Sequence, residues 1–179
     1  MIEGLARFAD HFSGFTDQYV LIGGAACDLA MQAAARTFRV TKDLDIVLCL
    51  ESLSGGFVES FWSFVRDGLY QSQEKEGGQR QFYRFGNPQT PGFPAMLELF
   101  ARMPDALHFE GQGHLIPIPM TEAVSSLSAI LLDTDYYGWI QAGKQIQQNV
   151  SIVRPEHLIP LKARAWLDLT DRKQSGGHV

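Results

Sequence analysis

Three acidic residues lie in apolar runs, where unpaired charges are unfavourable. Asp43 and Asp45 open the run "DLDIVLCL", and Glu98 lies within "PAMLELF". In a strand, residues i and i+2 point to the same side, so Asp43 and Asp45 project together. Neighbouring carboxylates repel each other unless a cation lies between them. Hard divalent cations take oxygen ligands, so the sequence predicts that Asp43, Asp45 and Glu98 bind Mg²⁺, or Mn²⁺ in its place.

A pair of glycines, Gly23 and Gly24, closes the apolar run "YVLI" and precedes an alanine-rich segment that begins at Ala25. Glycine has no Cβ, so its backbone can approach a ligand closely. The N–H groups at the start of a helix have no partners within the helix and favour an anion. An anion site at Gly23, Gly24 and Ala25 beside a divalent metal would suit a nucleoside triphosphate (NTP).

The elements that must position these residues follow from hydrophobic spacing. Helical spacing predicts helices over residues 2–13, 25–38, 57–70, 133–144 and 155–173, with Pro160 as the first residue of a new helix in the last segment. Strand composition predicts strands over residues 19–24, 43–50, 81–86, 95–100, 114–120, 124–132 and 149–153. A helix is the alternative for 124–132. This order predicts an α+β (mixed α/β) fold with a mixed sheet flanked by helices.

Composition limits the classes of function. The chain has 179 residues and a formal net charge of −5, so no global basic field exists to hold nucleic acid. No apolar run approaches the roughly 20 residues that span a bilayer, and the amphipathic N-terminus, with Glu3 and Asp10, does not fit a signal peptide. Cys27 and Cys49 are predicted to be buried free thiols. We therefore expect a cytoplasmic protein with no membrane contact.

The order of these motifs resembles a known family. A strand, a Gly-Gly or Gly-Ser turn, a helix and then Asp-x-Asp on the next strand is similar to the nucleotidyltransferase superfamily, which has the DNA polymerase β-like fold. The chain most resembles the AbiEii-like branch, the nucleotidyltransferase toxins of bacterial abortive-infection and toxin–antitoxin systems. The Arg-x-Thr-x-Asp-x-Asp run of that branch occurs here as Arg39, Thr41, Asp43 and Asp45. The match covers roughly residues 19–48.

The resemblance implies a Mg²⁺-dependent enzyme that transfers a nucleoside monophosphate from an NTP to a hydroxyl of a nucleic acid, such as tRNA, or of a protein. It further implies an antitoxin partner and a lysine on a C-terminal helix, a position that Lys162 fits. The resemblance makes Asp43, Asp45 and Glu98 the catalytic residues, and Arg39, Thr41 and Lys162 would then contact the nucleotide. The residues themselves leave alternatives open, because Glu98 could pair with Arg84 or Arg102, and Lys162 could extend into water.

The chain departs from the family pattern in three places, one of which is a gap between the glycines and the aspartates that is longer than in the smallest members. Gly24 replaces the serine of many members, so one hydroxyl contact to phosphate is missing. The last family motif, a basic residue followed by an acid on a later helix, has no match before the C-terminal "SGGHV". We expect one domain over residues 1–179, whose C-terminal helical part is either truncated or absent from this protein.

Two further functions fit the same residues. The domain could be a non-catalytic nucleotide- or partner-binding module, since a fold does not establish a function. It could also be a small-molecule nucleotidyltransferase of the aminoglycoside-modifying kind. A local basic cluster could contact RNA, and its members are Arg154, Lys162, Arg164, Arg172 and Lys173. Tyr136, Tyr137 and Trp139 are interpreted as a core or surface aromatic cluster, with stacking on a base as the alternative.

Overall fold

The structure is a computed structural model that describes the backbone of residues 2–37, 41–74, 80–102, 115–117, 128–132 and 134–174. Within these ranges, the side chains of residues 72–74, 80–83, 115–117, 128–132, 164–169 and 171–174 are not described. Among the described residues, no helix combines the length and the apolar character that a membrane span requires.

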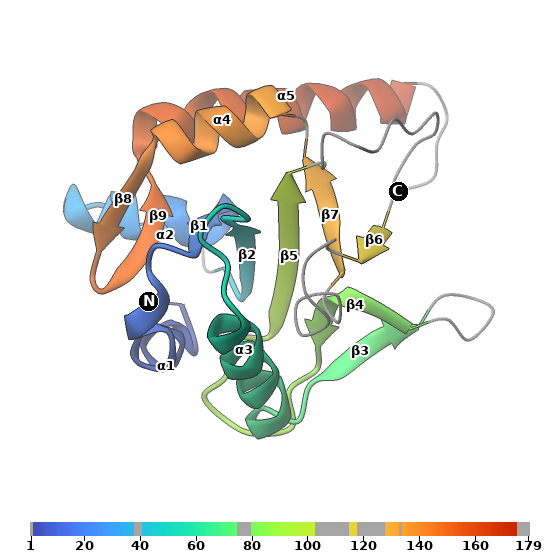
Figure 1. The fold of residues 1–179 in the computed structure, drawn as a ribbon. Helices are drawn as coiled ribbons and strands as arrows, with labels where there is room; N and C mark the ends of the chain where they lie inside the picture. Colours follow the sequence, from blue (N-terminus) through green and yellow to red (C-terminus); the bar gives the residue numbers. More distant parts are fainter. Residues whose placement is uncertain are drawn as a thin grey trace.

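The fold is α+β, with a mixed sheet flanked by helices, as the sequence predicted (Figure 1). The α-helices are α1 (Leu5–His11), α2 (Gly23–Ala33), α3 (Gly55–Asp67), α4 (Thr134–Ala142) and α5 (Pro155–Gln174), and a short 3₁₀ helix, η1, covers Ser13–Phe15. The strands are β1 (Tyr19–Ile22), β2 (Asp43–Leu48), β3 (Gln71–Glu74), β4 (Arg80–Gly86), β5 (Met96–Arg102), β6 (Leu115–Pro117), β7 (Ser128–Leu132), β8 (Lys144–Gln147) and β9 (Val150–Val153).

The described strands form one sheet in the order β3-β4-β5-β2-β1-β9-β8. At its centre β1 runs antiparallel to β2, and β2 runs parallel to β5. One edge of β5 is shared, because its first half pairs with β4 and its second half pairs with β7. The central strands β1, β2 and β5 therefore have neighbours on both sides, which favours apolar runs in their sequences.

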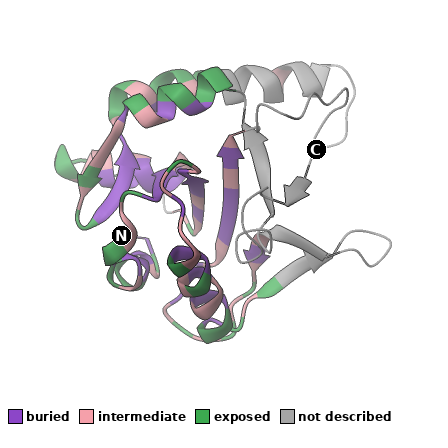
Figure 2. Ribbon diagram, in the orientation of Figure 1, coloured by how far each residue is buried: buried purple, intermediate pink, exposed green. Residues whose placement is uncertain are grey.

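One face of the sheet carries an aromatic core between the sheet and the helices α1 and α3. The ring of Phe12 lies at the centre of this core and contacts the rings of Phe8, His11, Tyr19, Phe57, Phe61 and Phe64, with centroids 4.5–6.3 Å apart. Ser54 begins α3 with a cap, because its hydroxyl accepts a hydrogen bond from the N–H of Phe57 at 3.2 Å. In Figure 2 the buried residues concentrate in the central strands and on the inward sides of these helices.

The opposite face carries the predicted acids. Tyr19 on β1 pairs with Leu48 on β2, and Ile22 pairs with Asp45. Directly paired residues project to the same side of a sheet. Because Tyr19 packs on the aromatic core and residues alternate along a strand, Asp45 projects away from that core. Helix α2 packs against β1 and β2, and α5 packs against α2.

Several predicted elements differ from the observed ones. Helix α5 continues through Pro160, so the prediction that a new helix begins there is wrong. A proline inside a helix removes one backbone hydrogen bond and kinks the helix, and the remaining turns still pack against α2 and α4. Strands β3 and β8 were not predicted because "QSQE" and "KQIQ" are nearly all polar. Cys49 is buried as predicted, but Cys27 is only half-buried.

Candidate functional site

The register of the central strands brings the predicted acids to one face. Asp45 on β2 pairs with Glu98 on β5, and Glu98 in turn pairs with Arg84 on β4. These three residues therefore form a row across neighbouring strands, with side chains on the same side. Asp43 lies two residues before Asp45 on β2 and shares that side. We call Asp43, Asp45 and Glu98 the acid cluster.

The electrostatics of Asp45 show how closely the cluster is coupled. Burial raises the pKa of Asp45 to about 6, and the negative charges of Glu98 and Asp43 act in the same direction. The positive charges of Lys162 and Arg84 act in the opposite direction, to a smaller extent than burial. A carboxyl group held at such a cost in free energy is a frequent mark of a functional site.

Glu98 is buried, and an arginine neutralises its charge. The guanidinium of Arg84 donates to Oε1 of Glu98 through Nε at 3.1 Å and through Nη2 at a closer approach. This pairing was one alternative that the sequence left open. Arg84 was not predicted as a site residue, although the sequence holds a signal, because it is a cation in the otherwise mostly apolar stretch "FYRF".

The glycine turn lies directly against the acid cluster. Gly23, the first residue of α2, has φ +63°, a conformation that glycine adopts without steric cost. A Cβ atom at Gly23 would lie 1.8 Å from Oδ2 of Asp45, and one at Gly24 would lie 2.6 Å from Oγ1 of Thr41. The missing side chains therefore allow two side-chain oxygens to approach the turn, which joins the glycine motif to the Thr-x-Asp-x-Asp segment.

The remaining predicted residues differ in their placement. Lys162 on α5 is exposed, and its positive charge acts to lower the pKa of Asp45. Ala25 is fully buried within the hydrophobic core. Arg39 lies outside the described residues. Of the predicted basic cluster, the side chains of Arg154 and Lys162 are described, and Arg154 contacts Glu156 and the carbonyl oxygen of Ala142.

The donor set of the acid cluster fits a hard divalent cation in its chemistry, since carboxylate oxygens are the ligands that Mg²⁺ prefers. Its arrangement is not that of a preformed ion site. Within the described part of the chain, no three His, Cys, Asp or Glu side chains are arranged to hold a metal ion. Glu98 accepts hydrogen bonds from Arg84, so binding of a metal by all three acids requires Glu98 to exchange that partner.

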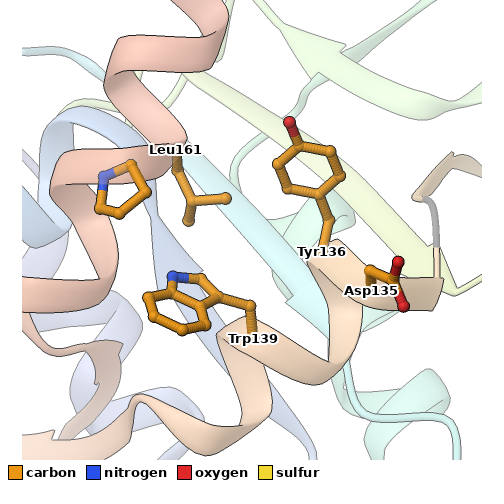
Figure 3. Close-up of a pocket in the computed structure, with 5 residues that line it drawn as sticks. Asp135, Tyr136, Trp139 and Leu161 are labelled. Carbon is orange, nitrogen blue, oxygen red and sulfur yellow. The ribbon is translucent and has the colours of Figure 1, made fainter.

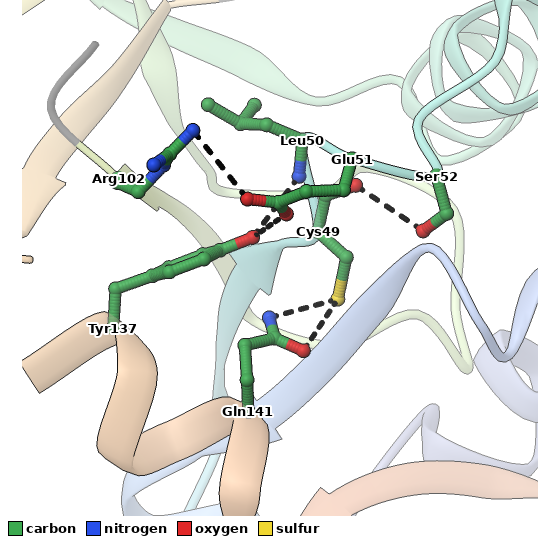
Figure 4. Close-up of polar contacts among 7 residues, drawn as sticks. All are labelled: Cys49, Leu50, Glu51, Ser52, Arg102, Tyr137 and Gln141. Atoms are coloured by element: carbon green, nitrogen blue, oxygen red, sulfur yellow. Dashed lines mark hydrogen bonds and ion pairs between the residues drawn. The ribbon is translucent and has the colours of Figure 1, made fainter. Parts of the chain in front are cut away.

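A second polar cluster, which the sequence did not predict, lies beyond the other end of β2 (Figure 4). The hydroxyl of Tyr137 on α4 contacts the carboxylate of Glu51 and accepts from the N–H of Leu50 at 3.2 Å. The amide of Gln141 donates to Sγ of Cys49 at 3.1 Å, and burial raises the pKa of that thiol. These contacts hold α4 against the end of β2, so Tyr137 contributes to the packing of the fold.

Searches against models of protein families, against curated proteins and against solved structures found no match to this chain. The geometry of the acid cluster and the glycine turn is therefore the basis for a functional proposal.

Proposed function

We propose that the chain is a Mg²⁺-dependent nucleotidyltransferase that transfers a nucleoside monophosphate from an NTP to a hydroxyl of a nucleic acid or a protein. One observation carries the proposal. Asp45 is paired with Glu98 across β2 and β5 and at the same time lies against the positive-φ turn at Gly23. Carboxylate oxygens therefore lie beside a backbone turn that can approach an anion. A triphosphate would use the turn, and its cation would use the carboxylates.

Each residue has a distinct role in this proposal. Asp43, Asp45 and Glu98 would hold the cation, which would neutralise the triphosphate oxygens and the oxygen of the acceptor hydroxyl. The N–H groups of the turn at Gly23 and Gly24 would bind the phosphate oxygens. Lys162 is exposed and its charge acts on Asp45, so its ammonium group would attract an anion placed there.

The reaction is an in-line displacement. The acceptor hydroxyl oxygen attacks the α-phosphorus and forms the new P–O bond, while the bond from the α-phosphorus to the oxygen that bridges to the β-phosphorus breaks. Pyrophosphate leaves with that oxygen and the electron pair of the broken bond. The hydroxyl proton passes to solvent or to a carboxylate of the acid cluster.

A labelling assay tests the proposal. The protein is incubated with α-labelled NTPs, Mg²⁺ or Mn²⁺, and total RNA or cell protein, and compared with Asp43→Asn and Asp45→Asn. We expect label on RNA or protein with the wild type and a loss of at least roughly 100-fold in each variant, since removing one charged group at a reacting centre has effects of this order. Asp10→Asn, at an exposed aspartate of α1, is the matched control and should keep full activity.

The acceptor decides between the branches of this proposal. Label on RNA or protein supports the toxin-like role, and growth arrest on expression of the wild type but not of Asp45→Asn would extend it to a toxin that requires an antitoxin. Label on a small alcohol such as an aminoglycoside would instead assign the small-molecule reaction.

One observation favours a second function, a non-catalytic nucleotide-binding module. The ion pair between Arg84 and Glu98 already satisfies the third acid, as a structural salt bridge would. A module would bind NTP saturably and transfer no label. Arg84→Gln separates the two functions, because release of Glu98 should strengthen Mn²⁺ binding if the acid cluster is a metal site and should only destabilise the fold if the pair is structural.

A further inference from the structure

An open apolar pocket of about 270 Å³ lies where α4 and α5 meet. Its lining consists of Asp135, Tyr136 and Trp139 from α4 and Pro160 and Leu161 from α5. Figure 3 shows the rings of Tyr136 and Trp139, both from α4, with the side chain of Leu161 from α5 between them. Tyr136 is 36% and Trp139 43% exposed, so both rings reach the surface of the protein.

The pocket offers rigid, flat apolar surfaces. The indole N–H of Trp139 donates to the carbonyl oxygen of His157 at 3.0 Å, and its ring packs on the imidazole of His157 with centroids 4.4 Å apart. These contacts fix the orientation of the Trp139 ring, so a ligand need not order it on binding. Aromatic faces that are held in place favour a planar ring, on which they stack.

The character of the lining restricts the ligand further. Four of its five residues present apolar or aromatic groups, and in Figure 3 the carboxylate of Asp135 points away from the aromatic rings. A phosphate is therefore disfavoured within the pocket, and a flat ring that stacks on an aromatic side chain is favoured. Nucleobases present such a flat face.

The pocket is connected to the acid cluster through α5. Leu161 lines the pocket, and the next residue, Lys162, carries the charge that acts on Asp45. Consecutive helical residues are separated by about 1.5 Å along the axis, so one turn of α5 carries both an apolar residue of the pocket and a cation whose charge acts on Asp45. A molecule with a flat apolar end and an anionic end would match both features.

We propose that this pocket binds the nucleobase of the substrate nucleotide by stacking on Tyr136 and Trp139. The inference rests on the proposed function and adds to it the residues that recognise the base. It reassigns the exposed pair of aromatic residues from a surface cluster to a binding surface, while Tyr137 remains a packing residue through its contact with Glu51.

The test measures tryptophan fluorescence during titration with the nucleosides adenosine, guanosine, cytidine and uridine, in EDTA. Without phosphate or metal, binding reports on the base alone. We expect saturable quenching in the wild type and in Asp45→Asn, and none with ribose 5-phosphate or inorganic triphosphate. Tyr136→Ala should weaken binding roughly 5- to 150-fold, the range for loss of one stacking contact on a base. Trp139→Phe keeps a stacking ring and should remove the signal, which assigns the quenching to this site.

Ile159→Ala is the matched control, because Ile159 is an exposed apolar residue of α5, 69% exposed, that does not line the pocket. It should bind nucleosides as the wild type does. Absence of quenching, or equal quenching in Tyr136→Ala, would overturn the base site. So would a dimer, seen by sedimentation velocity, that dissociates in Trp139→Ala, because the pocket would then be an interface between copies of this chain.

The outcome is separable from that of the labelling assay. Nucleoside binding that depends on Tyr136, in a protein that transfers no label, supports the base site and rejects the enzyme. Label transfer that does not depend on Tyr136, with no nucleoside quenching, supports the enzyme and rejects the base site.

Discussion

The two faces of the central sheet differ in what their side chains contribute. On one face, Leu44 and Ile46 of β2 are fully buried beneath the aromatic residues of α1 and α3. On the other face, the same strand carries Asp43 and Asp45, next to the buried Glu98 of β5. The first face gains free energy from buried apolar area, whereas the second holds like charges together at a cost. The second face, where this cost lies beside a well-packed core, is therefore the one on which we propose a functional site.

The largest effect is expected from Phe12→Ala, which breaks the aromatic face. Phe12 is fully buried and contacts rings from α1, β1 and α3, so its loss leaves a cavity between three elements. We expect a decrease of about 3–5 kcal/mol in the free energy of unfolding, measured by urea denaturation. Ile146→Ala, at a residue of β8 that is 65% exposed, should change it by less than about 0.5 kcal/mol.

The outcome for Phe12→Ala that contradicts this comparison is a cost no larger than that of Ile146→Ala. The aromatic face would then not be the main source of stability. Another source would have to offset the free-energy cost of the acid cluster.

The next effect is expected from Gly23→Ala, at the turn on the acidic face. A Cβ atom there would lie 1.8 Å from Oδ2 of Asp45. The alanine would also have to adopt the left-handed backbone of Gly23, with a φ of +63°. The left-handed backbone costs about 1–2 kcal/mol, and moving Asp45 costs more, so we expect a loss of about 2–4 kcal/mol on urea denaturation.

Gly14→Ala is the control for that variant, since a Cβ at Gly14 meets nothing within 4 Å. It should leave the free energy of unfolding within about 0.5 kcal/mol of the wild type. Equal losses in the two variants would mean that the turn at Gly23 is not pressed against the acid cluster.

Much of the aromatic face could be predicted from the sequence, and less of the acidic one. The spacing of Phe57, Phe61 and Phe64 predicted α3 and its buried side, because helical periodicity is a local signal. The shared face of Asp43 and Asp45 followed from strand alternation in the same way. The pairing of Arg84 with Glu98 could not be predicted uniquely, because it depends on which strands are neighbours in the sheet.

The contact between Gly23 and Asp45 is of the same non-local kind, since it depends on the antiparallel register of β1 and β2. Strands β3 and β8 were missed because they lie at the two ends of the sheet order, where polar sequences such as "QSQE" need bury no face. The open pocket at Trp139 could not be predicted because it requires the placement of α4 against α5.

A third prediction concerns the charge on Asp45 and depends on pH. The pKa of Asp45 in the folded, metal-free protein is raised to about 6, chiefly by burial, while in the unfolded chain it lies near the ordinary value of about 4. Between these values the folded state binds more protons than the unfolded state, so stability falls as the pH rises from 4 to 6. The cost is fully present above about pH 6 and absent below about pH 4.

Asp45→Asn removes that cost. In EDTA we expect the variant to be more stable than the wild type by about 1–3 kcal/mol at pH 7.5 and equally stable near pH 4, measured by urea denaturation at each pH. Asp10→Asn, at an exposed aspartate, should show no such pH-dependent gain. A variant that is less stable than the wild type at pH 7.5 would show that Asp45 supports the fold.

The smallest effect is expected from Lys162→Met, which tests whether α5 reaches the acid cluster. The charge of Lys162 lowers the pKa of Asp45, so its removal should raise that pKa further, by about half a pH unit or less for an exposed charge. An NMR titration of the Asp45 carboxyl carbon in EDTA measures the change. Lys42→Met is the matched control, because Lys42 directly precedes Asp43 and strand alternation directs it away from Asp45. If Lys42→Met raises the pKa as much as Lys162→Met does, the effect is one of net charge, and α5 has no specific relation to the acidic face.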